Sequence, residues 1–153
     1  MKLAVLLTSL LMASSAIAFE QVELDRLMET HQCQSCDLSH SDLSGHKLSR
    51  ADFSGANLNK ALLNNTTLIG AWFAHAKLDY TSFEQADLSR ANLDYAQLNN
   101  ANLRYANLQN AQLVFTNLSN ADLTGANLEG SYQRGTIFCN TMMPNGHINN
   151  SNC

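Results

Sequence analysis

The fold of this 153-residue chain is decided by a repeat of five residues, seen most clearly at residues 91–105, which read ANLDYAQLNNANLRY. The same unit continues in both directions without an insertion, so that residues 36–130 divide into 19 consecutive pentapeptides. The third residue of each unit is Leu in sixteen cases and Phe in three, and the first residue is Ala in thirteen. The second residue is Asp or Asn in eleven units.

A period of five fits neither regular element of secondary structure. On an α-helix, five residues advance about 500°, so successive Leu residues would drift around the axis and form no apolar stripe. On a flat strand, an odd period would send alternate Leu residues to opposite faces. The pattern therefore requires a backbone that turns a corner in every repeat, with the first and third residues inside and the other three outside.

These units resemble the pentapeptide repeat family, whose tandem A(D/N)LXX motifs are matched by residues 51–55, 91–95 and 101–105. The resemblance implies an all-β fold, a right-handed quadrilateral β-helix in which one unit forms one side. A coil then takes twenty residues, and residues twenty apart stack at about 4.8 Å. Because a solenoid leaves its end coils open, caps are required. We expect a short capping helix and entry segment at 19–35, the β-helix at 36–130, and a C-terminal cap at 131–153, with the register breaking at Gln133.

The first eighteen residues are typical of a signal peptide. Lys2 is followed by an apolar run too short to cross a bilayer, and Ala16-Ile17-Ala18 is a small-x-small cleavage site. We predict that the mature chain begins at Phe19 and is exported to the periplasm or secreted. Without Lys2 its net charge is 8 − 13 = −5, which, with no basic run, argues against a nucleic-acid binder. No apolar stretch of the mature chain is long enough to span a membrane.

Export favours disulfides among the four cysteines. In the fold that the resemblance implies, one pair lies at each end of the rod, which predicts the bonds Cys33–Cys36 and Cys139–Cys153. Two alternatives for the N-terminal pair stay open. It could be a redox-active or free thiol pair, or, with two histidines nearby in the sequence, a metal site. The ligands of that site would be His31, Cys33, Cys36 and His40. We predict no cofactor.

The twenty-residue register places several rings on the outside of one side. His75, Tyr95 and Phe115 fall at the same position of successive coils, and Trp72 lies on the same side. Tyr80, at the next corner, is expected to extend this patch. Exposed aromatic surface of this kind is typical of an interaction site, although the rings could also only stack and stiffen the rod. His46 falls at an inward position normally held by Ala, so we expect a loosened first coil in which His46 reaches the cap.

Other functions have less support in the residues. Some cytoplasmic members of the resembled family act as DNA mimics against gyrase through acidic surfaces, but here the carboxylates are spread over all four sides. Catalysis needs polar groups that converge in a concave site, whereas this rod has an apolar interior and convex sides, so we predict no enzyme activity. The sequence favours a monomer or weak dimer that binds an unidentified protein of the cell envelope. A redox or metal-handling protein is the alternative.

Overall fold

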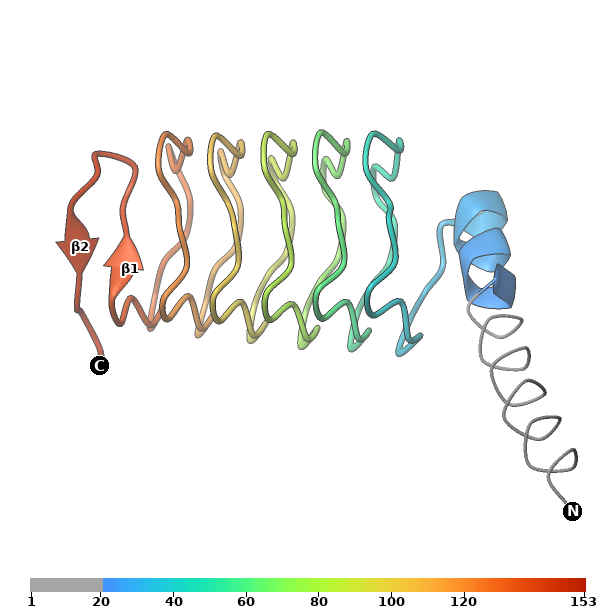
Figure 1. The fold of residues 1–153 in the computed structure, drawn as a ribbon, viewed down its shortest axis with the longest axis horizontal. Helices are drawn as coiled ribbons and strands as arrows, with labels where there is room; N and C mark the ends of the chain where they lie inside the picture. Colours follow the sequence, from blue (N-terminus) through green and yellow to red (C-terminus); the bar gives the residue numbers. More distant parts are fainter. Residues whose placement is uncertain (1–20) are drawn as a thin grey trace, which may run out of the picture.

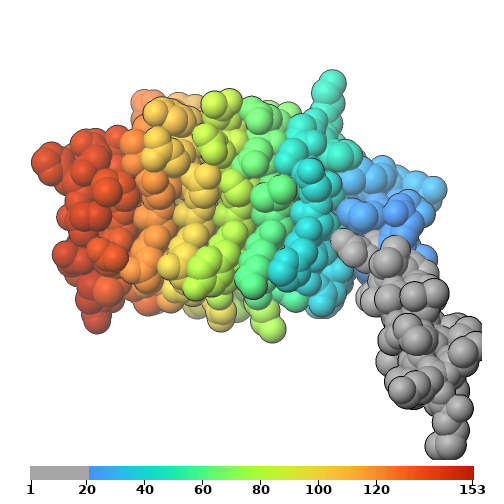
Figure 2. Space-filling view, viewed as in Figure 1, coloured from blue at the N-terminus to red at the C-terminus, as the bar shows by residue number. Residues whose placement is uncertain are grey.

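The computed structural model of the protein describes residues 21–153 and forms a rod of stacked coils (Figure 1). Residues 21–30 are helical and lie at one end of the rod, and a short hairpin lies at the other end. The coils follow one another without interruption, and their side chains make a continuous surface (Figure 2). No helix within residues 21–153 is long and apolar enough to cross a membrane.

Neighbouring coils pair through isolated parallel bridges between residues twenty apart. The bridges run from Gln32↔Asp52 to Asp122↔Met142, one for every five residues. Each bridge carries hydrogen bonds along the rod axis, such as those from the Asn92 N–H to the Ala71 carbonyl at 2.9 Å and from the Leu93 N–H to the Gln112 carbonyl at 2.8 Å. One coil is therefore four sides of five residues, and backbone polar groups are paired between coils.

A tight turn closes every side. The fifth residue of each unit, from Ser35 to Asn140, has φ between 54° and 72°. In most units the N–H of the following residue returns to the carbonyl of the central Leu, as from Ala96 to Leu93 at 3.0 Å. A positive φ at the third residue of such a four-residue turn is the arrangement of a type II turn. The left-handed corner points the fifth side chain outward.

The frequent Asp or Asn at the second position has a local cause. In all eleven such units the side-chain oxygen accepts a hydrogen bond from the backbone N–H two residues later, at 2.9–3.3 Å. In four other units that N–H is bound instead by an Asn or Asp one coil earlier, as in the bond from the Val114 N–H to Asp94 at 2.8 Å. These side chains satisfy backbone donors that the coil-to-coil ladder leaves free.

The interior is filled by the first and third residues of the units. Leu and Phe at the third position are buried, except for the partly buried Leu128 of the last unit, and Phe53 and Phe73 stack with ring centroids 4.9 Å apart. Where Thr replaces Ala at the first position, its hydroxyl donates to a carbonyl of the preceding coil, as from Thr116 to Leu93 at 2.8 Å. Buried hydroxyls are thus paired, and the core stays close-packed.

Both ends of the rod are covered in part. At the N-terminal end, Leu27 from the helical residues is fully buried and Leu24 packs against the core. At the C-terminal end, β1 (Thr141–Met142) pairs with the preceding coil at Asp122 and antiparallel with β2 (Ile148–Asn149). The hairpin therefore adds β2 to the hydrogen-bonded stack of coils, and β2 is the last edge of that stack.

The regular coil extends past both limits of the expected array. Its bridges begin at Gln32 and end at Met142. The predicted register break at Gln133 is wrong for the backbone, because Tyr132 pairs with Gln112, Gly135 turns the next corner, and the Thr136 hydroxyl binds the Leu113 carbonyl. The Gln133 side chain itself is exposed. A polar residue is tolerated there because no further coil covers this side of the last turn.

Candidate functional site

Three rings form a stacked column, here called the aromatic ladder, made of His75, Tyr95 and Phe115. The centroids of His75 and Tyr95 are 4.9 Å apart with an angle of 7° between the rings, and those of Tyr95 and Phe115 are 5.4 Å apart with an angle of 24°. All three residues occupy left-handed corner positions. The twenty-residue coil therefore brings residues far apart in sequence into van der Waals contact on the outside of the rod.

The aromatic ladder ends at Phe115, because the corner residue of the next coil is Gly135. A β-carbon at Gly135 would lie 2.6 Å from the Phe115 ring, so a side chain there would displace the ring. The ring of Phe115 therefore lies over the backbone of the next coil. At the other end, Gly55 precedes His75 by one coil, and a β-carbon there would meet only the Ser35 hydroxyl, at 3.3 Å.

Trp72 lies on the same side of the rod as the ladder and is 52% exposed. It occupies the second position of its unit, where Asp or Asn usually binds the N–H two residues on. No side chain within residues 21–153 accepts a hydrogen bond from the Ala74 N–H. Trp72 also falls in a run of five units that all lack Asp or Asn at this position. Trp72 therefore places a large ring at a position where eleven of the nineteen units have Asp or Asn.

Two further exposed tyrosines, Tyr80 and Tyr132, were treated differently by the prediction. Tyr80, predicted to extend the patch, lies at the corner of the next side, is 60% exposed, and is in no ring stack among residues 21–153. Tyr132, which the sequence analysis missed, lies on the side of Trp72 and is 65% exposed. Because the repeat register was expected to break at Gln133, the neighbouring Tyr132 was not assigned to a side of the rod. Its spacing of twenty residues from Gln112 and sixty from Trp72 is the signal that would have found it.

The surface around the ladder carries little charge. The fourth residues of the units on this side lie between the ladder and the second residues, which include Trp72 and Tyr132. These fourth residues are Ala74, Asp94, Val114 and Arg134, so only two of them are charged. The described ion pair within the coils, Arg104–Asp122 at 3.0 Å, lies on another side. There, burial raises the pKa of Asp122, but hydrogen bonds from Thr124 and the Arg104 guanidinium outweigh it, so the pKa is lowered.

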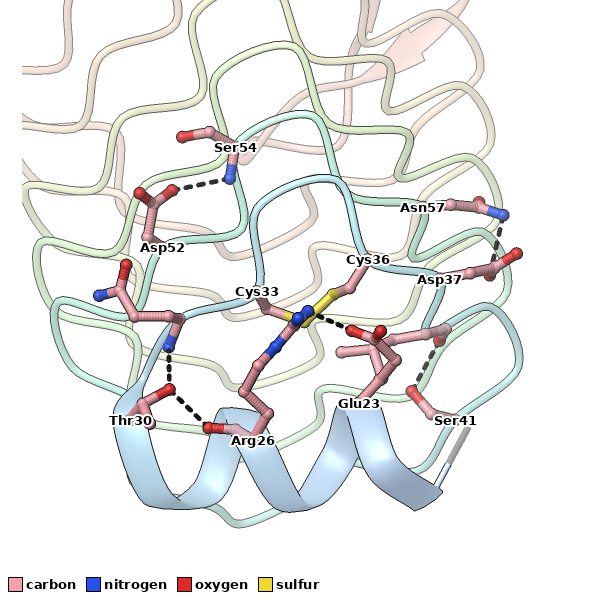
Figure 3. Close-up of a disulfide and its surroundings, with 12 residues drawn as sticks. Glu23, Arg26, Thr30, Cys33, Cys36, Asp37, Ser41, Asp52, Ser54 and Asn57 are labelled. Carbon is pink, nitrogen blue, oxygen red and sulfur yellow. Dashed lines mark hydrogen bonds and ion pairs between the residues drawn. A yellow bond between two sulfur atoms is a disulfide. The ribbon is translucent and has the colours of Figure 1, made fainter. Parts of the chain in front are cut away.

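The N-terminal cysteines lie inside the first coil rather than outside it. Cys33 and Cys36 are joined by a disulfide, are 0% and 5% exposed, and belong to the core (Figure 3). Cys33 occupies the third position of its unit and Cys36 the first position of the next, so the bond spans one corner turn. Glu23 of the helical segment points at this disulfide and pairs with Arg26 (Figure 3).

The histidines proposed as metal ligands are not gathered around these sulfurs. Within residues 21–153, the group that lies within ligand distance is Glu23, Cys33 and Cys36, whose ligand atoms are all within 4.8 Å of one another. His31 is half-buried and His40 is exposed. The expectation of a loosened first coil in which His46 reaches the cap is wrong: its side chain is exposed, with Nδ1 3.2 Å from the Ser44 carbonyl, and its backbone keeps the regular pattern. An imidazole is too large for the inward position, and the open end of the coil lets it turn out.

The C-terminal cysteines fasten the last segment to the rod. Cys139 and Cys153 form a second disulfide, with Cα atoms 4.7 Å apart. The same segment is held by a hydrogen bond from the Phe138 N–H to the Ser151 carbonyl at 3.0 Å. Cys153 is exposed, in contrast to the buried N-terminal pair.

Comparison with known proteins identifies the family. The sequence profile described as "Pentapeptide repeats" matches residues 32–70, 67–104 and 96–138, with eight copies of its unit. The chain belongs to the pentapeptide repeat family. Pentapeptide repeat proteins form right-handed quadrilateral β-helices, in agreement with the four five-residue sides of each coil seen here. A search of curated proteins gives no match.

Several solved pentapeptide repeat proteins share this fold. Rfr23 from the cyanobacterium Cyanothece 51142 is 31% identical, with a TM-score of 0.74 over 76% of this chain and 92% of that one. The protein alr5209 from Nostoc PCC 7120 is 23% identical, with a TM-score of 0.57 over the same shares. QnrB1, a plasmid-mediated fluoroquinolone resistance protein, is 24% identical, with a TM-score of 0.54 over 69% of this chain and 49% of that one. The last two likenesses show the fold alone.

Proposed function

We propose that this pentapeptide repeat protein is an exported, non-catalytic module that binds another protein through one side of its rod. The binding side comprises the aromatic ladder and Trp72. Protein interfaces are enriched in aromatic residues, and here Trp72, Tyr95 and Phe115 are each about half exposed, at 52%, 50% and 47%. We infer a monomer or weak dimer in the absence of the partner.

The observation that carries the proposal is Trp72. An Asp or Asn at this position would bind the Ala74 N–H, as it does in the eleven units that have one. The tryptophan makes no such bond and leaves much of its ring in water. Because Trp72 leaves the Ala74 N–H without a side-chain acceptor among residues 21–153 and keeps about half of its surface exposed, a role outside the fold explains it better than stacking does. The aromatic ladder, by contrast, could serve either to bind a partner or to stiffen the rod, since its rings pack on one another.

The export part of the proposal rests on the sequence and on the cysteines. Residues 1–18 lie outside the residues that the structure describes, so the predicted signal peptide remains a prediction. All four cysteines are disulfide-bonded in the structure, which suits an oxidising compartment. Mass spectrometry of the protein purified from the envelope tests this: a chain that begins at Phe19 supports export, and an intact Met1 in a cytosolic fraction contradicts it.

The substitution Trp72→Asn separates binding from folding. The new side chain can accept the Ala74 N–H, so the free energy of unfolding should be unchanged or up to about 1 kcal/mol higher. Tyr105→Asn is the matched control, because Tyr105 is 54% exposed but lies on a different side of the rod. The measurement is affinity capture from an envelope extract with wild type and both variants, together with thermal denaturation of each.

The expected result is a protein retained by wild type and by Tyr105→Asn but lost by Trp72→Asn at equal or higher thermal stability. A triple variant, Trp72→Ser/Tyr95→Ser/Phe115→Ser, should lose it completely. Equal retention by wild type and the triple variant would assign the rings to stability alone. In that case the N-terminal cysteine region would become the better candidate.

The redox or metal-handling alternative has a specific weakness. Both sulfurs of Cys33 and Cys36 are buried beneath the helical residues 21–30, so a thiolate from another protein cannot reach them without displacing that segment. Thiol counting on the native protein discriminates the two readings. Free thiols at Cys33 and Cys36 would favour the alternative.

A further inference from the structure

A cavity of about 440 Å³ lies towards the C-terminal end of the rod, on the side that carries the aromatic ladder. None of the residues that line it belongs to the ladder. The lining residues are Asn110, Gln112, Val114, Gly130 and Tyr132. They come from two neighbouring coils, at the corner where residues 106–110 pass into 111–115 and residues 126–130 pass into 131–135. The volume falls within the range of small-molecule sites, about 300–1,000 Å³.

Gly130 leaves its corner of the coil without a side chain, next to the side chain of Asn110. A β-carbon there would collide with the Asn110 side-chain oxygen, and φ at Gly130 is 66°. Any larger residue would therefore push the Asn110 amide away. Glycine at this corner keeps both the hollow and the position of that amide.

Two side-chain amides that line the cavity are unpaired among the residues that the structure describes. The side-chain amides of Asn110 and Gln112 make no hydrogen bond within residues 21–153, unlike the neighbouring Gln109, which binds Glu129 at 3.3 Å. Each amide offers both donors and an acceptor. None of the five lining residues carries a charge, and Tyr132 adds a ring that is 65% exposed.

The backbone at this place is already occupied. The Leu113 N–H binds the Tyr132 carbonyl at 2.8 Å, and the Tyr132 N–H binds the Ala111 carbonyl at 2.9 Å. A peptide cannot add to this side as a strand, because that mode needs free backbone groups at a sheet edge. The ligand must be recognised by side chains, through neutral amides and a ring face.

We propose that this cavity binds a neutral hexopyranose unit of an oligosaccharide. The C–H face of the sugar packs on the Tyr132 ring and contacts Val114. Sugar hydroxyls, which both donate and accept, pair with the amides of Asn110 and Gln112. A ring face with a few placed polar groups is the usual composition of a small-ligand site. The five lining residues themselves offer no charged partner for a phosphate or a carboxylate of a sugar.

The test is a titration of the full, disulfide-bonded protein with cellotetraose, maltotetraose and chitotetraose in turn, followed by NMR of the Val114 methyl groups and the tyrosine rings. We expect at least one oligosaccharide to shift Val114 and Tyr132 saturably, with a dissociation constant on the order of 1 mM. Tyr132→Ala should weaken binding about tenfold or more, and so should Gln112→Ala, an exposed position that does not test the fold. Tyr105→Ala, which removes an exposed tyrosine on another side, should leave the affinity unchanged.

Three outcomes would overturn the proposal. The first is no shift at Val114 with any of the three oligosaccharides. The second is an affinity unaffected by both Tyr132→Ala and Gln112→Ala. The third is an equal shift of the Tyr105 ring, which would mean that the sugars contact any exposed tyrosine. Because the variants leave Trp72 in place, they can fail without affecting the proposed protein-binding function, and the reverse also holds.

Discussion

At the scale of single residues, each position of the pentapeptide has a physical cause. The first and third fill the interior, the second binds a backbone N–H two residues later, and the fifth turns a left-handed corner. The repeat is therefore a local chemical rule applied many times. Departures from the rule, such as Trp72, are the positions at which function is most readily sought.

The second position can be tested at Asn92, whose side-chain oxygen accepts the Asp94 N–H at 2.9 Å. Asn92→Ala should lower the free energy of unfolding by about 1 kcal/mol, because that donor loses its partner. Lys77→Ala is the control, since the corresponding N–H of Asp79 is bound by Asn59 from the preceding coil. Urea denaturation of both variants measures the difference. Equal losses would show that the hydrogen bond makes no net contribution.

The corner position can be tested by comparing two glycines. Gly45→Ala introduces only the strain of a positive φ, since nothing lies within 4 Å of the new β-carbon. This should cost about 1 kcal/mol. Gly135→Ala adds a collision with the Phe115 ring and should be clearly more destabilising in thermal denaturation. In a Phe115→Ala background the two glycine substitutions should become equal, and a persistent difference would argue against the ring contact.

At the scale of elements, the coils need closed ends, and the two ends are closed differently. The N-terminal end uses the helical residues 21–30 over a buried disulfide, and the C-terminal end uses the β1–β2 hairpin and a disulfide between the half-buried Cys139 and the exposed Cys153. In both places a disulfide lies next to a segment that has no coil beyond it. A terminal coil has only one neighbour, so it is the part of a solenoid that opens most easily.

The C-terminal disulfide should therefore stabilise its own end most. Cys139 and Cys153 are separated by 14 residues, a loop for which the chain-entropy description gives about 3 kcal/mol. In Cys139→Ser/Cys153→Ser, the Phe138 N–H, which binds the Ser151 carbonyl, should exchange with solvent much faster, whereas the Leu93 N–H in the middle of the rod should not change. Hydrogen exchange read by NMR gives both rates in one experiment. Faster exchange at both amides would instead indicate that the rod opens as one unit.

At the scale of the whole molecule, the carboxylates link stability to pH. Hydrogen bonds from the Ser39 hydroxyl and N–H hold the pKa of Asp37 below its ordinary value of 3.8, and Ser44 does the same for the pKa of Asp42. At Asp52, burial raises the pKa, but bonds from Ser54 and Gln34 outweigh it and the pKa is lowered. Asp122 behaves alike. All four carboxylates are thus bound in the form that is charged.

A lowered pKa in the folded state contributes stability that is fully present above the unfolded pKa of 3.8 and is lost as the pH falls through the lower folded value. The urea midpoint should therefore be flat from about pH 7 to about pH 5 and fall steadily from about pH 4 downward. Replacing the four residues by Asn keeps an oxygen for each backbone N–H and should flatten that fall. An unchanged acid slope would assign it to other groups.

The interior and the register of the rod could be predicted from the residues alone, because both depend on a local rule that repeats. A period of five with Leu at its centre forces a corner in every unit, and nineteen uninterrupted units leave one twenty-residue register. The stacking of His75 on Tyr95, and of Tyr95 on Phe115, follows from that register. The family and the apolar interior follow in the same way.

The ends and exceptions were decided by tertiary structure. The sequence predicts that His46 reaches the cap, but its side chain lies exposed beside the Ser44 carbonyl, because the surroundings of a residue in the end coil depend on what packs against that coil. The coil continues through Gln133, because pairing with the preceding coil and the Thr136 hydroxyl hold a backbone whose central side chain is polar. The cavity beside Tyr132, and the position of Glu23 against the buried disulfide, join residues from different elements. Contacts of this kind depend on three-dimensional packing, which a local repeat does not encode.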